Sequence, residues 1–146
     1  MGKEEDIMEL GGWKPLNLNQ EAFVQELQQQ IREFVRERDW EQYHSPKNLA
    51  MALSVEVAEI LEIFQWQTEQ ASATPDAHTR AHLEEEIGDV MILLTNLADR
   101  LEIDPISAAK KKLVINRSKY PAEKVCGKSF KYTAYQPSDE GNSALD

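Results

Sequence analysis

The segment SVEVAEILEIFQW (residues 54–66) places three glutamates in a pattern that is otherwise apolar and helical. At 3.6 residues per turn, Glu56 falls within the apolar stripe of this helix and Glu59 falls at its edge. Glu62 falls further round, on the polar side. The helix is therefore expected to turn one pair of carboxylates, three residues apart, toward the interior of the protein.

A second segment, EEEIGDV (residues 84–90), repeats this arrangement. Glu86 falls at the centre of an apolar helical stripe, Asp89 at its border and Glu85 further out. An unpaired buried carboxylate is costly or takes up a proton, and four converging carboxylates cannot all stay ionised without a counter-charge. We therefore expect a positive group between the two helices.

Ion pairs with lysine or arginine, or a wrongly assigned helix face, would account for a single glutamate in such a position. They account less well for a matched set. The helix that contains Glu56 has no lysine or arginine after Lys47. The helix that contains Glu86 has none close to the acids before Arg100, and Arg80 is more than a turn from Glu86. A bound cation is the better explanation.

The chemistry of the ligands favours Mg²⁺, with Mn²⁺ as a substitute, because hard cations prefer carboxylate oxygens together with phosphates and water. Zinc would call for cysteine or histidine among the ligands. A di-iron bundle would need Glu-x-x-His pairs on core helices. The candidate for such a pair, Glu41 and His44, lies in the segment before Pro46 instead.

Four helices are expected to position these acids. Asn19 can cap the first helix, Ser45 and Pro46 suit the start of the second, and Asp104 and Pro105 suit the start of the fourth. No segment alternates with a two-residue period, so the fold class is all-α, with four helices in a bundle-like arrangement. The predicted helices span residues 19–38, 46–68, 77–101 and 105 to just before Tyr120.

The 146 residues are enough for one domain, which we place at residues 19–132 between an N-terminal arm (1–18) and a flexible C-terminal tail (133–146). The formal net charge of −10 argues against binding to nucleic acid polymers or anionic membranes. The single cysteine, Cys126, fits a reducing compartment, and no apolar run is long enough to span a membrane. A cytoplasmic protein is expected.

Four blocks in order resemble the MazG-like all-α nucleoside triphosphate pyrophosphohydrolases, and most closely their dCTP pyrophosphatase branch. The resemblance covers residues 20–131. It implies Mg²⁺-dependent hydrolysis of a (d)NTP between the α- and β-phosphates, giving the monophosphate and pyrophosphate in a house-cleaning role. The four blocks are QYHSPKNL (42–49), SVEVAEILEIFQW (54–66), EEEIGDV (84–90) and KLVINRSKYP (112–121).

The resemblance also implies roles for individual residues. Metal would be held by Glu56, Glu59, Glu86 and Asp89, and Glu59 or Glu56 would take a proton from the attacking water. The residues that would contact the nucleotide are Trp40, Trp66, Lys112, Asn116 and Tyr120.

His44 lies near the predicted mouth of the site, where a substrate contact and a purely structural role are both open. Ile31 and Leu93 depart from the dCTP-specific pattern, because they occupy positions at which those relatives have an imidazole and a phenol. Cytosine specificity is therefore an open question, whereas the metal chemistry is unaffected.

The acids lie on two predicted helices and the residues that would contact the nucleotide lie on another. A single chain of this size rarely brings such residues together in one site. A homo-oligomer is therefore expected, and the resemblance implies a homodimer or homotetramer with sites near the subunit interfaces. The competing interpretation is a non-catalytic helical interaction module whose internal acids bind a basic partner. It predicts no requirement for a divalent metal.

Overall fold

The structure is a computed structural model, and it describes residues 20–129. The predicted arm, the cap Asn19 and the predicted tail lie outside the described residues. Within the described range the chain forms helices and no strand, which confirms the all-α class. The helices are α1 (Gln20–Glu37), α2 (Pro46–Phe64), α3 (Glu69–Ser72), α4 (Ala77–Arg100), α5 (Pro105–Lys119) and α6 (Ala122–Val125).

The predicted starts of two helices are confirmed, together with the groups that cap them. Ser45 Oγ accepts a hydrogen bond from the backbone N–H of Asn48 at 3.2 Å, and a proline opens α2. Asp104 Oδ1 accepts from the backbone N–H groups of Ile106 and Ser107 at 2.9 and 3.2 Å at the start of α5. Each side chain satisfies donors that have no partner within the helix.

The predicted helix 46–68 was too long. Helix α2 ends at Phe64, and the segment predicted as a connector contains the short helix α3. Thr68 Oγ1 accepts a hydrogen bond from the backbone N–H of Ala71 at 3.1 Å. A threonine in this position offers the backbone an alternative to continuing the helix, so a new turn begins there.

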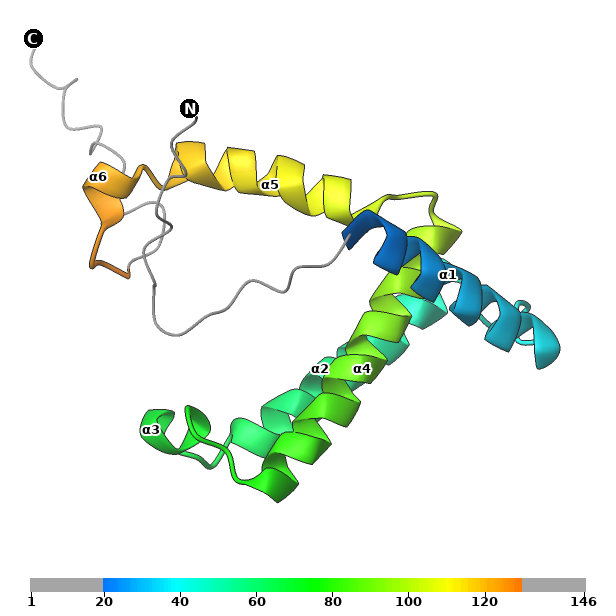
Figure 1. Cartoon of the computed structure of the whole chain (residues 1–146), viewed down its shortest axis with the longest axis horizontal. Coiled ribbons are helices and arrows are strands. Elements are labelled where there is room, and N and C mark those ends of the chain that lie inside the picture. Colours follow the sequence, from blue (N-terminus) through cyan, green and yellow to red (C-terminus); the bar gives the residue numbers. More distant parts are fainter. Residues whose placement is uncertain (1–19, 130–146) are drawn as a thin grey trace, which may run out of the picture.

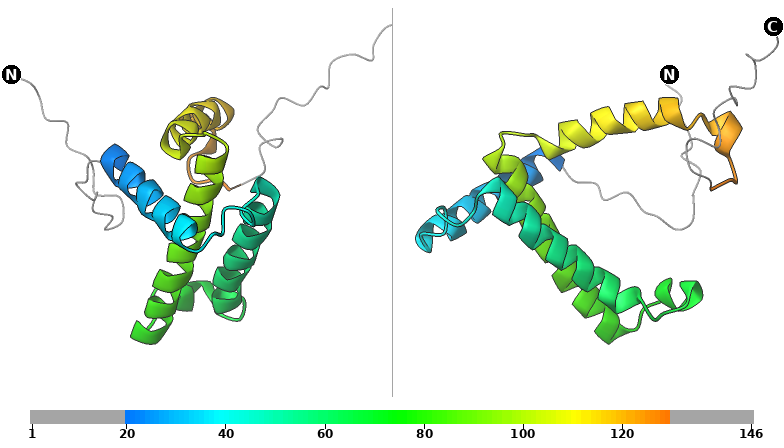
Figure 2. Two further views of the ribbon diagram at one scale, coloured as in Figure 1. Left: turned by 90° about the vertical axis from the view of Figure 1, so that its right-hand side faces the viewer. Right: turned by 180° about the vertical axis from the view of Figure 1, so that it is seen from behind.

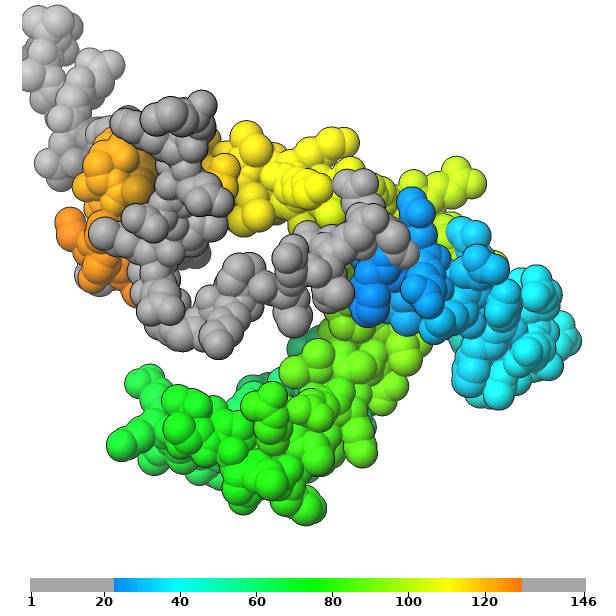
Figure 3. Space-filling model, viewed as in Figure 1, coloured from blue at the N-terminus to red at the C-terminus, as the bar shows by residue number. Residues whose placement is uncertain are grey.

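Helices α2 and α4 form an antiparallel hairpin, and α1 packs across α4 (Figures 1 and 2). Helix α5 leaves the end of α4 and extends away from this hairpin. Figure 3 shows the same divergence in the space-filling view. The four helices predicted to make a bundle are present, but within one chain they do not close around a common core.

The buried apolar core lies where α1 and α2 meet α4. Among the described residues it consists of Ile31, Val35, Leu49, Leu83 and Ala98. Such a core is small for a chain of this length. Further stabilising apolar burial is therefore expected from surfaces that residues 20–129 leave exposed.

Helices α2, α4 and α5 expose large apolar side chains on consecutive turns or positions, and on α2 these include Met51 and Val55. On α4 these include Ile87 and Met91, and on α5 Leu113, Val114 and Ile115 are 55, 64 and 48% exposed. Contiguous exposed apolar surface is typical of a protein interface. No helix in residues 20–129 has both the length and the apolar character needed to cross a membrane.

An ion pair fixes α1 against α4. Arg32 Nε donates to Asp99 Oδ2 at 2.7 Å, and Arg32 Nη2 donates to Asp99 Oδ1. The hydrogen bonds from Arg32 lower the pKa of Asp99, which is half-buried. This two-point geometry makes the pair stronger than a typical surface ion pair.

We expect Asp99→Asn to lower the free energy of unfolding by about 1 kcal/mol at pH 7. Because the folded pKa of Asp99 is lowered, the ion pair stabilises the fold above the usual aspartate pKa of about 4 and is lost as the pH falls through the folded value. Urea unfolding at pH 7 and pH 3 measures both effects. The difference between wild type and variant should shrink at pH 3.

Glu37→Gln is the control, since Glu37 pairs with Arg38 on an exposed surface. It should change the free energy of unfolding by less than about 0.5 kcal/mol at either pH. Equal effects of the two substitutions would show that the Arg32–Asp99 pair does not hold α1 in place.

Candidate metal centre

Helices α2 and α4 each supply one pair of acids to their shared interface. On α2 Glu56 is half-buried and Glu59 is exposed, and on α4 Glu86 is buried and Asp89 is exposed. Each pair is three residues apart, so its two side chains project from adjacent turns of one face. The antiparallel packing of the helices brings the two pairs opposite each other.

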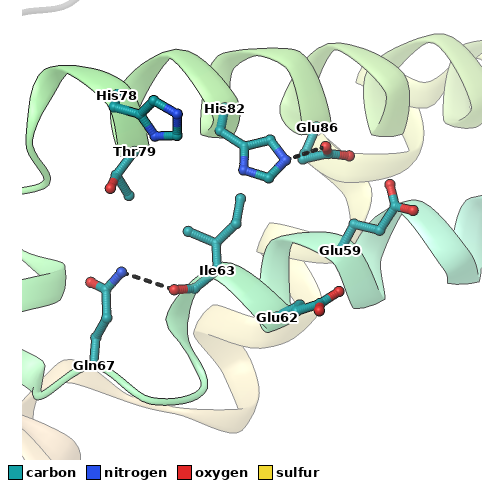
Figure 4. A pocket seen from close by; sticks show the side chains of 8 residues that line it. All are labelled: Glu59, Glu62, Ile63, Gln67, His78, Thr79, His82 and Glu86. Carbon is teal, nitrogen blue, oxygen red and sulfur yellow. Dashed lines mark hydrogen bonds and ion pairs between the residues drawn. The ribbon is translucent and has the colours of Figure 1, made fainter.

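Three of the four carboxylates converge. One oxygen each from Glu56, Glu86 and Asp89 lies within 4.8 Å of the other two. Glu59 stands beside this set, facing Glu86 from the opposite helix (Figure 4). The four residues predicted from sequence are therefore brought together in the structure, and Glu59 is set apart from the three that converge most closely.

This grouping disfavours ionisation. Burial raises the pKa of Glu86, and the neighbouring Glu59 carboxylate raises it further. Burial likewise raises the pKa of Glu56, followed by the effect of Glu59 and then of Asp89. Like charges held this close in a partly dehydrated interface need a cation or a proton.

A basic side chain contributes only part of that balance. His82 Nε2 lies 3.0 Å from Glu86 Oε1, with the two residues one turn apart on α4. Glu86 Oε2 is buried without a hydrogen-bond partner. An orphaned carboxylate oxygen within an all-oxygen donor set fits a hard divalent cation such as Mg²⁺.

Two cavities flank the acids. The first, which we call the histidine cavity, has a volume of about 410 Å³ and borders Glu59 and Glu86. Figure 4 shows His78 and His82 on its α4 side. Glu62, predicted to lie on the polar face of its helix, is exposed and lines this cavity.

The second cavity, which we call the aromatic cavity, has a volume of about 380 Å³ and borders Glu56 and Asp89. Trp40 and His44, two of the predicted substrate contacts, line it. Its other wall residues are mainly apolar. They include Phe34 and Ile92, together with Ile31 and Leu93, the two residues that depart from the dCTP-specific pattern. The acids thus meet a space with the shape and chemistry of a planar aromatic ligand site.

The remaining predicted contacts are not brought to the acids within one chain. Trp66 is 89% exposed just beyond the end of α2 and lines neither cavity. Lys112 and Asn116 share a face of α5, and Tyr120 caps its end, but α5 extends away from the α2–α4 hairpin (Figure 1). Their roles in substrate binding stay predictions.

Two site residues were missed from the sequence. His82 lies four residues before Glu86, a spacing that would have predicted their contact on one helix face. Asn96 is buried on α4 and lines the aromatic cavity. A buried amide at the border of an apolar stripe was a detectable signal, but its partner could not have been inferred from spacing.

Comparison with known proteins places this geometry in context. The sequence profile of the MazG-like family matches residues 51–134. The dCTP pyrophosphatase 1 of Rattus norvegicus is 39% identical over 135 residues, covering 90% of this chain and 77% of that protein. The dCTP pyrophosphatase 1 of Homo sapiens is 42% identical over 115 residues, covering 77% of this chain and 68% of that protein.

A similar solved structure is that of a pyrophosphatase from Archaeoglobus fulgidus. It is 42% identical in sequence, and the superposition has a TM-score of 0.61. The similarity covers 75% of this chain and 98% of that one.

If the four acids hold a divalent cation, Glu86→Gln should remove the thermal stabilisation by Mg²⁺. At a concentration about 100 times the dissociation constant, Mg²⁺ should stabilise the wild type by about 2.7 kcal/mol. Without metal, the variant should melt at or above the wild-type temperature, because one repelling charge is gone. Differential scanning calorimetry with and without Mg²⁺ measures both.

Glu85→Gln is the matched control, because Glu85 is exposed on the same helix and outside the converging set. It should keep the full response to Mg²⁺. An undiminished response in Glu86→Gln would place the cation elsewhere.

Proposed function

The chain belongs to the MazG-like family, and on that premise we propose that it hydrolyses nucleoside triphosphates between the α- and β-phosphates with Mg²⁺, releasing a monophosphate and pyrophosphate. Mn²⁺ would substitute for Mg²⁺. A role in clearing surplus or non-standard (d)NTPs fits this activity. The observation that carries the proposal is the convergence of Glu56, Glu86 and Asp89 beside a cavity lined by aromatic residues.

The acids would hold the metal, and their arrangement separates them by role. Glu56, Glu86 and Asp89 form the converging set and would be ligands. When bound, Mg²⁺ supplies charge neutralisation for the phosphate oxygens and a Lewis-acid centre for the attacking water. A net-acidic site can accept a triphosphate only with such cations present.

Glu59 is the better candidate for the general base. Its exposed carboxylate lies next to Glu56 and Glu86 but outside the set that converges within 4.8 Å. In the proposed step, a water oxygen forms a bond to phosphorus and the bridging bond between the α- and β-phosphates breaks. Glu59 accepts the proton that the water loses.

The aromatic cavity would receive the base. The rings of Trp40 and Phe34 meet edge to face with centroids 5.9 Å apart, and Trp40 and His44 lie 6.1 Å apart at a tilt. Such a wall suits a flat, partly apolar ligand. The cavity also borders Glu56 and Asp89, so a base seated here would direct its phosphates toward the metal ligands.

A second copy of the chain would complete the site. Within the described residues neither cavity is lined by a lysine or arginine, and the predicted cationic contact, Lys112, lies on the diverging helix α5. The exposed apolar residues on α4 and α5 are typical of a surface that packs against another protein chain. We therefore propose a homodimer or homotetramer in which α5 of one subunit reaches the acids of another.

Pyrophosphate release from a panel of common and modified (d)NTPs tests the activity. The wild type should require Mg²⁺. Glu59→Ala should lower kcat by about 100-fold or more, because a positioned general base contributes about 10²–10⁴. Its KM should change less.

Glu69→Ala provides a control at an exposed acid in α3, which lines neither cavity. It should leave both constants unchanged. Full activity in Glu59→Ala would remove this residue as the base. No activity of the wild type on any nucleotide would sink the catalytic proposal and leave a non-catalytic helical module as the alternative.

Co-expression of two inactive variants tests whether subunits share a site. Glu86→Gln and Lys112→Ala, on differently tagged chains, should each be inactive alone. In a purified mixed dimer one of the two sites would contain both intact residues, so about half of the wild-type activity should return. The purified doubly tagged species is the sample to assay.

The outcome depends on which chain supplies each residue. If Glu86 and Lys112 of one chain served the same site, every site in a mixed dimer would carry a defect. Mixed oligomers that form and stay inactive would therefore refute the shared site. Size-exclusion chromatography with light scattering establishes that they form.

A further inference from the structure

A partly buried hydrogen bond joins Asn96 of α4 to His44 in the loop before α2. Asn96 Nδ2 lies 3.1 Å from His44 Nδ1, although the residues are 52 positions apart in the sequence. Asn96 is only 7% exposed, and both residues line the aromatic cavity. The contact is therefore part of the cavity wall.

This bond determines where His44 carries its proton. An amide NH₂ group can only donate, so Nδ1 of His44 must accept and the ring proton of the neutral imidazole lies on Nε2. Burial lowers the pKa of His44, and the positive charge of Arg100 lowers it further. The neutral form with an Nε2–H donor is favoured at neutral pH.

The donor at Nε2 is open to a ligand. Within residues 20–129, no hydrogen bond from this nitrogen to the protein accompanies the bond at Nδ1. Among the described residues, Glu86 Oε2 is the one side-chain atom that is buried without a partner. His44 Nε2, which has no partner there, is therefore not buried. Within the described part of the chain, Nε2–H is thus neither hydrogen-bonded nor buried without access to a ligand.

We propose that Asn96 is a positioning residue for base selection, which holds His44 as an Nε2–H donor toward the base in the aromatic cavity. This inference rests on the proposed function. It assigns the substrate class as nucleotides whose base has an unprotonated ring nitrogen on its pairing edge, as cytosine has at N3. Uracil and thymine have an N–H there, which opposes an N–H donor.

The wall of the cavity also contains Gln30, whose side-chain amide donates a hydrogen bond to Glu26. Ile31 and Leu93 line the same cavity and offer no hydrogen bond. Trp40 provides an aromatic surface that does not distinguish one base from another by hydrogen bonding. The His44–Asn96 pair therefore supplies hydrogen-bonding groups to a cavity in which Ile31 and Leu93 supply none.

Asn96→Leu tests the proposal, because leucine is close in size to asparagine and lacks hydrogen-bonding groups. The ratio of kcat/KM for dCTP to that for dUTP should fall by roughly tenfold, since one hydrogen bond that discriminates is lost. The fall should appear mainly in KM for dCTP. Glu85→Gln, at an exposed acid of the same helix that lines neither cavity, should leave the ratio unchanged.

The imidazole ¹⁵N chemical shifts of His44 give a readout that does not depend on activity, with the signals assigned through His44→Gln. In the wild type Nδ1 should be unprotonated and Nε2 protonated. In Asn96→Asp the new carboxylate can only accept, so Nδ1 should become protonated. This second variant decides the question if Asn96→Leu does not fold.

The two possible failures are distinct. If no nucleotide is hydrolysed by the wild type, the proposed function fails. If hydrolysis occurs but the dCTP-to-dUTP ratio is the same in folded Asn96→Leu, the inference fails alone. A protonated Nδ1 in the wild type, or identical His44 shifts in Asn96→Asp, would also overturn it.

Discussion

The structure depends on a repulsion that the chain does not relieve by itself. Glu56, Glu86 and Asp89 converge within 4.8 Å at the interface of α2 and α4, and Glu86 Oε2 is buried without a partner. A chain selected for stability alone would have placed apolar residues there, because unpaired buried carboxylates oppose folding. Carboxylates that repel one another in this way are typical of a functional site, and a bound divalent cation would offset their repulsion and stabilise the folded state.

The helical hairpin is suited to hold such a group. Both acid pairs lie on long helices that pack along each other, so their geometry does not rely on a loop. The aromatic cavity on one side of the acids is built where α1 and the following loop meet α4. The Arg32–Asp99 ion pair that fixes α1 against α4 therefore also supports this cavity. In the proposed oligomer, a second subunit would pack on the exposed apolar surface of α4 and α5.

Features governed by local spacing were predictable from the sequence. The caps Ser45 and Asp104 were predicted because they depend on neighbouring backbone groups, and the acid pairs because three residues nearly complete a helical turn. The end of α2 was misjudged because the cap at Thr68 competed with an uninterrupted helical pattern.

Long-range features were not predictable in the same way. The Asn96–His44 bond spans 52 residues and depends on how the loop before α2 meets α4. In the proposed oligomer, the position of α5 relative to the acids of another copy would depend on contacts between copies, which spacing along one sequence does not specify.

The most direct test of the central claim is the position of a bound divalent ion. Mn²⁺ can replace Mg²⁺ in an all-oxygen site, and its anomalous X-ray scattering locates it without ambiguity. In crystals grown with Mn²⁺ and a non-hydrolysable nucleotide, a peak is predicted between Glu56, Glu86 and Asp89, about 2.2 Å from their carboxylate oxygens. Nucleotide bound in the crystal with no ion among these three carboxylates would contradict the account.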